Sequence, residues 1–228
     1  MRSQSTDDYL KALYKLETEE KPVSTTALAR LMKVTAASAT GMIQRLARDK
    51  LVAYRRYYGV RLSPEGKRIA LRVIRNHRII ELFLAEELGV SWDKVHQEAE
   101  AWEHVVSTEV VEKMADRLGN PKRGQRGQLI PERDGAMPEQ RDHVLADAAI
   151  GALLRVTEVE DDDAGVLQHL VSIGLGPDSR LEITERRQYD NLLVIRVGGK
   201  TEILGPSLAQ RIRVARLPVV RRSKEKVV

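Results

Sequence analysis

The sequence of 228 residues contains no cysteine. A chain without cysteine cannot build a disulfide framework or a thiolate metal site, and such a composition suits a reducing compartment. No apolar run approaches the roughly 20 residues that a membrane-spanning helix needs. Acidic residues interrupt the N-terminal stretch at once, so the apolar core of a signal peptide is missing. With 42% hydrophobic and 31% charged residues, the composition predicts a globular protein of the cytoplasm.

The charge is unevenly distributed along the chain. Residues 1–75 contain 16 Lys and Arg against 7 Asp and Glu, whereas residues 76–118 contain 4 against 10. A basic segment favours a polyanionic partner and an acidic segment favours a cation. Chance clustering of charges on solvated helix faces is the alternative at this point.

Residues 1–73 have the pattern of a winged helix-turn-helix domain. Helical periodicity predicts a first helix over residues 5–20, a second from the Ser24 cap to Met32, and a third over residues 36–49. Residues 51–62 are rich in β-forming side chains around a central glycine, as in a hairpin. Two short helices joined by a tight turn, followed by a hairpin wing, place the second of them in the major groove of DNA.

Two kinds of side chain in this region suit DNA. Small and hydroxyl-bearing residues at the start of the recognition helix allow close approach to base edges, and arginines there and in the wing can neutralise phosphates. The predicted DNA-binding residues are Thr35, Ala37, Ser38, Thr40, Gly41, Arg45, Arg48, Arg55 and Arg56. A winged helix that makes only protein contacts is the alternative.

The acidic middle of the chain contains a cluster of metal-ligand residue types. Ser63-Pro64 predicts the start of a long helix that ends near Gly89, and the next helix is expected over residues 91–118. That second helix would carry His96, Glu100, Glu103 and His104 on one face, and the helix before it would carry His77 and Glu81 four residues apart. Histidines and carboxylates on facing helices form metal sites. A solvated charged face would explain the glutamates but not three histidines in register.

The remainder of the chain changes character. Residues 120–147 are rich in Pro, Gly, Arg and Gln and are predicted to be a linker. Residues 148–218 contain short β-like runs at 152–159, 181–184, 192–197 and 212–216, which predict a small β-barrel. The tail, residues 219–228, is expected to be flexible. The predicted fold is therefore mainly α with β.

These motifs together resemble the DtxR/MntR family of metal-dependent repressors. The resemblance rests on TDDYLKALY from Thr6, NHRIIELFL from Asn76, VHQEAEAWEH from Val95 and LGNP from Leu118. It implies that residues 74–119 form a helical metal-binding and dimerisation domain, and that residues 148–218 are an SH3-like domain of the FeoA type. The chain would then be a homodimer that binds an inverted-repeat operator in double-stranded DNA.

The resemblance also implies two metal sites. The primary site would consist of Asp8, Glu100, Glu103 and His104, and the ancillary site of His77, Glu81, His96 and Asp163. Iron sensors of the family have sulfur ligands at the positions of Asp8 and Glu100, so the two carboxylates here favour Mn(II) as the cofactor. Short manganese sensors have a further glutamate at the position of Lys11, so a binuclear site of that type is not expected.

The expected function is a Mn(II)-activated transcriptional repressor of metal-homeostasis genes. An Fe(II)-responsive repressor of the same family is the first alternative. A metallohydrolase is another, because these ligands could activate water, although neither a nucleophile nor a phosphate-binding motif accompanies them. A winged-helix regulator that answers an organic ligand in the barrel is the third.

Overall fold

The computed structural model describes residues 3–18, 20–91, 94–161 and 163–217. The chain divides into two compact units. The first comprises residues 1–84, 97–122 and 129–138, and the second comprises residues 85–96, 123–128 and 139–228. None of the helices in the described ranges is both long and apolar enough to cross a membrane.

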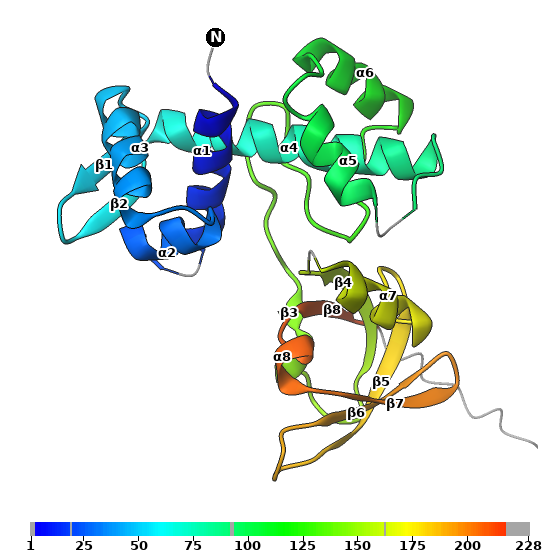
Figure 1. Ribbon diagram of the computed structural model, residues 1–228. Coiled ribbons are helices and arrows are strands. Elements are labelled where there is room, and N and C mark those ends of the chain that lie inside the picture. Colours follow the sequence, from blue (N-terminus) through cyan, green and yellow to red (C-terminus); the bar gives the residue numbers. More distant parts are fainter. Residues whose placement is uncertain (1–2, 19, 92–93, 162, 218–228) are drawn as a thin grey trace, which may run out of the picture. The chain divides into compact units, whose positions relative to one another are not determined.

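The N-terminal part of the first unit contains three helices before the wing (Figure 1). It contains α1 (Gln4–Leu16), α2 (Thr25–Leu31) and α3 (Ala36–Arg48). The Ser24 side chain accepts a hydrogen bond from a backbone N–H of α2, and the Thr35 side chain does so for α3. Such caps satisfy amide groups that lack a partner inside the helix. The apolar faces of the three helices meet in one buried core.

The wing is a two-stranded antiparallel hairpin. Its strands are β1 (Val52–Arg55) and β2 (Gly59–Leu62). Behind it, a Cβ atom at Gly66 would lie 2.0 Å from the backbone oxygen of Leu51. A side chain at position 66 would therefore clash with the backbone of Leu51. Glycine lets the helix that begins at Pro64 lie directly against the residue before β1.

Three further helices follow the wing: α4 (Pro64–Glu86), α5 (Val95–Trp102) and α6 (Thr108–Arg117). The expectation of one continuous helix over residues 91–118 was therefore wrong. The side chain of Ser107 accepts a hydrogen bond from the Val110 backbone and caps a new helix. Cap residues of this kind compete with the helical backbone, which explains the interruption.

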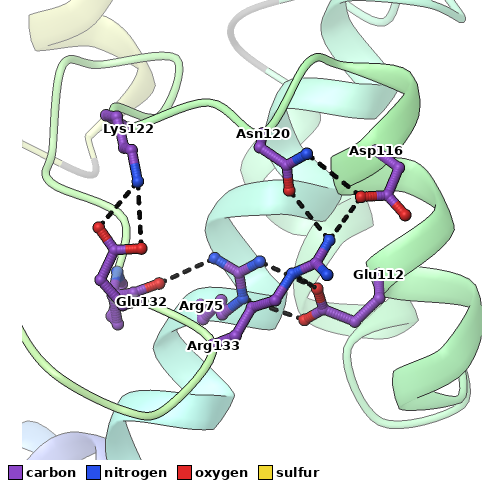
Figure 2. A network of polar contacts seen from close by, with 8 residues as sticks. Arg75, Glu112, Asp116, Asn120, Lys122, Glu132 and Arg133 are labelled. Atoms are coloured by element: carbon purple, nitrogen blue, oxygen red, sulfur yellow. Dashed lines mark hydrogen bonds and ion pairs between the residues drawn. The ribbon is translucent and has the colours of Figure 1, made fainter.

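Residues 129–138, in the predicted linker, pack against α4 and α6 within the first unit. The Arg75 guanidinium donates to the Pro131 carbonyl oxygen over 2.9 Å and to both oxygens of Glu112. Arg133 pairs with Glu112 and Asp116 (Figure 2). This stretch has neither helix nor strand, but polar contacts tie it to the helices.

The second unit is built on a six-stranded antiparallel sheet with strand order β3-β8-β4-β5-β6-β7. Its strands are β3 (His143–Val144), β4 (Leu153–Val159), β5 (Arg180–Arg186), β6 (Leu193–Val197), β7 (Lys200–Leu204) and β8 (Ile212–Arg216). It also contains the 3-10 helix η1 (Leu145–Asp147) and the helices α7 (Ala164–Ser172) and α8 (Pro206–Ala209). Alternate residues of the strands, such as Val156, Ile183 and Ile195, form its core.

The four predicted strand runs correspond to β4, β5, β6 and β8. The prediction missed β3, β7 and both helices of this unit. The predicted flexible tail at residues 219–228 lies outside the described residues. The fold class is confirmed: a winged helix, a helical region and a C-terminal sheet domain.

Candidate metal centre and DNA-binding surface

Asp8 and His104 meet although 95 residues separate them in the sequence. The Nε2 atom of His104 lies 3.2 Å from Oδ1 of Asp8 and 3.5 Å from Oε1 of Glu103. One ligand atom from each of the three residues can be chosen so that all lie within 4.8 Å of one another. Glu103 is buried, and Asp8 and His104 are half-buried. Three of the four predicted primary ligands therefore converge.

The fourth predicted primary ligand, Glu100, joins a neighbouring group. It forms a second such triple with His77 and Glu103, and its Oε1 atom lies 3.1 Å from the Nζ atom of Lys11. The same Nζ atom lies 3.0 Å and 3.1 Å from the two carboxylate oxygens of Glu103. Sequence reasoning noted Lys11 only as a departure from short manganese sensors. Its spacing from Asp8, three residues along one helix, was the signal that it would face the same cluster.

His77 lies between two carboxylates. Its Nδ1 atom is 2.6 Å from Oε2 of Glu103, and its Nε2 atom is 3.2 Å from Oε1 of Glu81. An imidazole that donates from both ring nitrogens is protonated. Burial alone would lower the pKa of His77, but its hydrogen bonds to Glu103 and Glu81 raise the pKa above the ordinary value. Glu103 is thus shared between the neighbourhoods of His104 and His77.

The charged groups in the cluster shift one another's acidity. Burial alone would raise the pKa of Glu103, but His77 and Lys11 lower it by hydrogen bonds and by charge. Burial raises the pKa of Asp8, and the positive charge of His104 only partly opposes this effect. Burial would lower the pKa of Lys11, but Glu103 and Glu100 raise it. The cluster therefore retains an ionised Glu103 beside an ionised Lys11.

Two of the candidate ligands lie just beyond a helix. Glu103 and His104 follow α5 in a turn, so the prediction that they lie within a long helix was wrong. The backbone N–H of Glu103 still donates to the Ala99 oxygen over 2.9 Å. Glu103 therefore continues the helical path of α5, while the turn directs His104 towards Asp8.

The donor set fits a divalent metal ion with a preference for hard ligands. Asp8 and Glu103 offer oxygen atoms and His104 offers a ring nitrogen. Metal bonds of about 2.0 to 2.2 Å to nitrogen and oxygen place neighbouring ligand atoms roughly 3 to 3.5 Å apart. The measured separations of 3.2 and 3.5 Å around His104 match this spacing. These three residues could hold such an ion, with Glu100 one helical turn before His104.

The residues of the predicted ancillary set are divided between the two units. His77 and Glu81 are in contact on α4, as their spacing predicted. His96 is the second residue of α5 and belongs to the other compact unit. Asp163, also in that unit, caps α7 by accepting hydrogen bonds from the backbone of Gly165 and Val166. The ancillary site stays a prediction.

The predicted DNA-contacting residues lie on the surface of α3 and the wing. All of them are exposed except Thr40, which is half-buried: Thr35, Ala37, Ser38, Gly41, Arg45, Arg48, Arg55 and Arg56. The Thr35 hydroxyl oxygen accepts from the Ser38 N–H, and the Thr40 hydroxyl donates to the Ala36 carbonyl. These two hydroxyls therefore already stabilise α3.

Two tyrosines at the wing tip were missed in the sequence. Tyr57 and Tyr58 have exposed fractions of 89% and 63%. The Arg55 guanidinium carbon lies 4.0 Å from the centre of the Tyr58 ring, and that of Arg56 lies 4.9 Å from the Tyr57 ring. The run YRRYYG was the available signal. Exposed rings that hold arginines in place extend the basic surface of the wing.

Known families match all three regions of the chain. Residues 1–60 match the N-terminal DNA-binding domain of the iron-dependent repressors, and residues 63–132 match their metal-binding and dimerisation domain. Residues 143–216 match the FeoA domain. A solved structure described as a manganese-dependent transcriptional repressor in complex with manganese is 36% identical, with a TM-score of 0.86 over 93% of this chain and all of that one. The chain belongs to the DtxR family of metal-dependent transcriptional repressors.

Other relatives differ in the metal that their names report. The repressor is 27% identical to the iron-dependent repressor IdeR of Mycobacterium leprae over 93% of its own length and 97% of that protein. It is 29% identical to the structure of ScaR with bound Zn²⁺, with a TM-score of 0.81 over 93% and 99% of the two chains. The family consists of DNA-binding repressors rather than enzymes, so the metallohydrolase hypothesis is dropped.

Proposed function

We propose that this repressor is activated by Mn(II) held at the primary site of Asp8, Glu100, Glu103 and His104. The observation that carries this proposal is the convergence of Asp8, Glu103 and His104, which supply oxygen and nitrogen and no sulfur. Carboxylate-rich sites suit manganese, whereas thiolate and thioether ligands favour softer metals. The 36% identical relative described as manganese-dependent supports the same choice.

The position of the ligands explains how a metal would control DNA binding. Asp8 lies on α1, which packs in the same core as the recognition helix α3, whereas Glu103 and His104 follow α5. A divalent cation at this site would be bound by Asp8 from α1 and by Glu103 and His104 from the segment after α5. Asp8 and His104 would then fix α1 relative to the helical region and so favour one orientation of α3. Metal selects that population, and by linkage DNA must tighten metal binding equally.

We further propose that a homodimer of the repressor binds an inverted-repeat operator in the cytoplasm and represses metal-homeostasis genes. The exposed arginines of α3 and the wing support phosphate contacts. The match to a dimerisation domain supports a two-fold assembly, and two-fold symmetric proteins read two-fold symmetric sites.

Response to Fe(II) is the second candidate because several full-length relatives are named as iron-dependent repressors. The double substitution Asp8→Met with Glu100→Cys distinguishes the two assignments. It replaces two oxygen ligands with sulfur and should shift activation of DNA binding from Mn(II) towards Fe(II). A wild-type protein that responds to Fe(II) but not to Mn(II) under anaerobic conditions would contradict the manganese assignment and leave the repressor assignment intact.

A further inference from the structure

Lys11 places a cation of the protein itself among the candidate metal ligands. Its Nζ atom lies 3.1 Å from Oε1 of Glu100 and 3.0 and 3.1 Å from the two oxygens of Glu103. The Lys11 side chain is 24% exposed and that of Glu103 is 1% exposed. An ammonium group has three donors, and each of these three contacts ends on a carboxylate oxygen.

The oxygens that Lys11 contacts are also those that a metal ion would need. Oε1 of Glu103 lies near both Lys11 Nζ and His104 Nε2, at 3.0 and 3.5 Å. Oε2 of Glu103 contacts Lys11 and His77. Neither oxygen of this buried carboxylate is therefore clear of a nitrogen group. A divalent cation that takes Oε1 of Glu103 must share or displace the ammonium, and two cations at one carboxylate repel each other.

Lys11 also contacts Glu100, the fourth predicted primary ligand. Oε1 of Glu100 is paired with the ammonium group, and Glu100 groups with Glu103 and His77, beside the triple of Asp8, Glu103 and His104. Because Lys11 lies on α1 with Asp8, the ammonium links α1 to α5 and to the turn after it. A metal ion held by Asp8 and His104 would link the same two parts of the chain.

We propose that Lys11 is a specificity-determining residue: an internal cation that competes with the divalent metal for Glu100 and Glu103 and thereby weakens metal binding. This inference rests on the proposed function of the primary site. In the metal-free protein the ammonium offsets part of the negative charge of the two glutamates and stabilises their arrangement. When a metal binds, the Lys11 ammonium must release at least one of the two glutamates. The repressor therefore needs a higher metal concentration than it would need with the same ligands and no lysine at position 11.

The test compares Lys11→Met with Lys15→Met. Both substitutions remove one positive charge from α1, but Lys15 is exposed in the last turn of the helix, so the pair separates local from long-range charge effects. The Kd for Mn(II) is measured by competition with a fluorescent chelator. We expect the Kd of Lys11→Met to be at least tenfold lower than that of wild type, and the Kd of Lys15→Met to change less than twofold.

A second measurement isolates the metal-free state. With excess chelator, Lys11→Met should melt at a lower temperature than Lys15→Met, because Glu103 loses a paired cation. If Lys11→Met does not fold, Lys11→Gln keeps a hydrogen-bond donor without the charge and should show the same gain in affinity.

Equal Kd values for the Lys11 and Lys15 variants, or weaker binding after loss of Lys11, would overturn the proposal. A wild-type protein that binds no Mn(II) would contradict the proposed function instead. In that case, if Lys11→Met bound Mn(II), the result would still support competition between Lys11 and the metal. If Lys11→Met also failed to bind Mn(II), the inference would be overturned as well.

Discussion

The 3.2 Å contact between His104 Nε2 and Asp8 Oδ1 joins the first helix of the winged-helix domain to the turn after α5. A second contact between two predicted primary ligands, from His104 Nε2 to Glu103 Oε1, is longer at 3.5 Å. Because one partner lies on α1 and the other in the helical region, the pair of Asp8 and His104 would couple metal binding at the proposed primary site to the part of the molecule that is predicted to contact DNA.

The substitution His104→Ala should weaken Mn(II) binding by about 100-fold or more, because it removes the single nitrogen ligand of the converging triple. The matched control is His169→Ala, at an exposed histidine of α7. Isothermal titration calorimetry of both variants measures the change, and circular dichroism verifies that both are folded. If His104→Ala bound Mn(II) as tightly as the control, the assignment of the primary site would be wrong.

Arg55→Ala should weaken binding to all DNA sequences alike. Arg55 is exposed in the wing and stacks on Tyr58, so we expect it to contact a phosphate. The slope of log affinity against log salt concentration should decrease by about 1. Arg180→Ala, at an exposed position of β5, serves as the control. A change in base preference rather than in salt dependence would show that the wing reads sequence directly.

The stability of the metal-free protein should depend on pH through His77 and Glu103. Despite burial, the pKa of Glu103 is lowered, so its contribution is present above the ordinary value of 4.5 and is lost as the pH falls through the lowered pKa. Despite burial, the pKa of His77 is raised, so its contribution is present below 6.5 and is lost as the pH rises through the raised pKa.

The pair should therefore stabilise the fold most between pH 4.5 and 6.5. The measurement is the free energy of unfolding in urea, with chelator present, for wild type and Glu103→Gln at pH values inside this window and on both sides of it. The difference between the two proteins should be largest inside the window and should shrink on both sides. A difference that does not vary with pH would contradict the described pairing.

Arg75→Met should destabilise the first unit more than Arg133→Met does. Arg75 is buried and binds both Glu112 (Figure 2) and the Pro131 carbonyl. Its loss removes this donor from the Pro131 oxygen and leaves Glu112 with Arg133 alone, at a cost of about 3 kcal/mol. The Arg133 side chain is 54% exposed, and its ion pairs should contribute about 1 kcal/mol or less. Equal effects in urea unfolding would show that residues 129–138 do not depend on Arg75.

Local signals predicted the winged helix well. Ser24 acts as a cap in the structure as predicted, and the hairpin falls where its β-forming residues lie. Thr35, predicted only as a DNA-contacting residue, caps α3 as well. Cap and turn residues act on the backbone of their immediate neighbours, so their effect can be predicted from the local sequence. Helical spacing likewise placed His77 against Glu81.

Contacts between distant segments were harder to predict. The interruption of the helix at Ser107 depends on a competition between capping and helix continuation, which periodicity does not resolve. The position of Lys11 among Glu100 and Glu103 depends on how α1 packs against a segment about 90 residues away. The strands β3 and β7 are short or exposed and lack an apolar run of their own.

The affinity of the wild-type protein for DNA, titrated separately with Mn(II), Fe(II) and Zn(II) under anaerobic conditions, decides whether metal controls this repressor. The probe is a duplex recovered by selection from random sequence in the presence of Mn(II), followed by fluorescence anisotropy. We predict weak binding in chelator and strong activation by Mn(II). Zn(II) should bind at least as tightly by the Irving–Williams order but activate less. Equal DNA affinity with and without every metal would contradict metal activation.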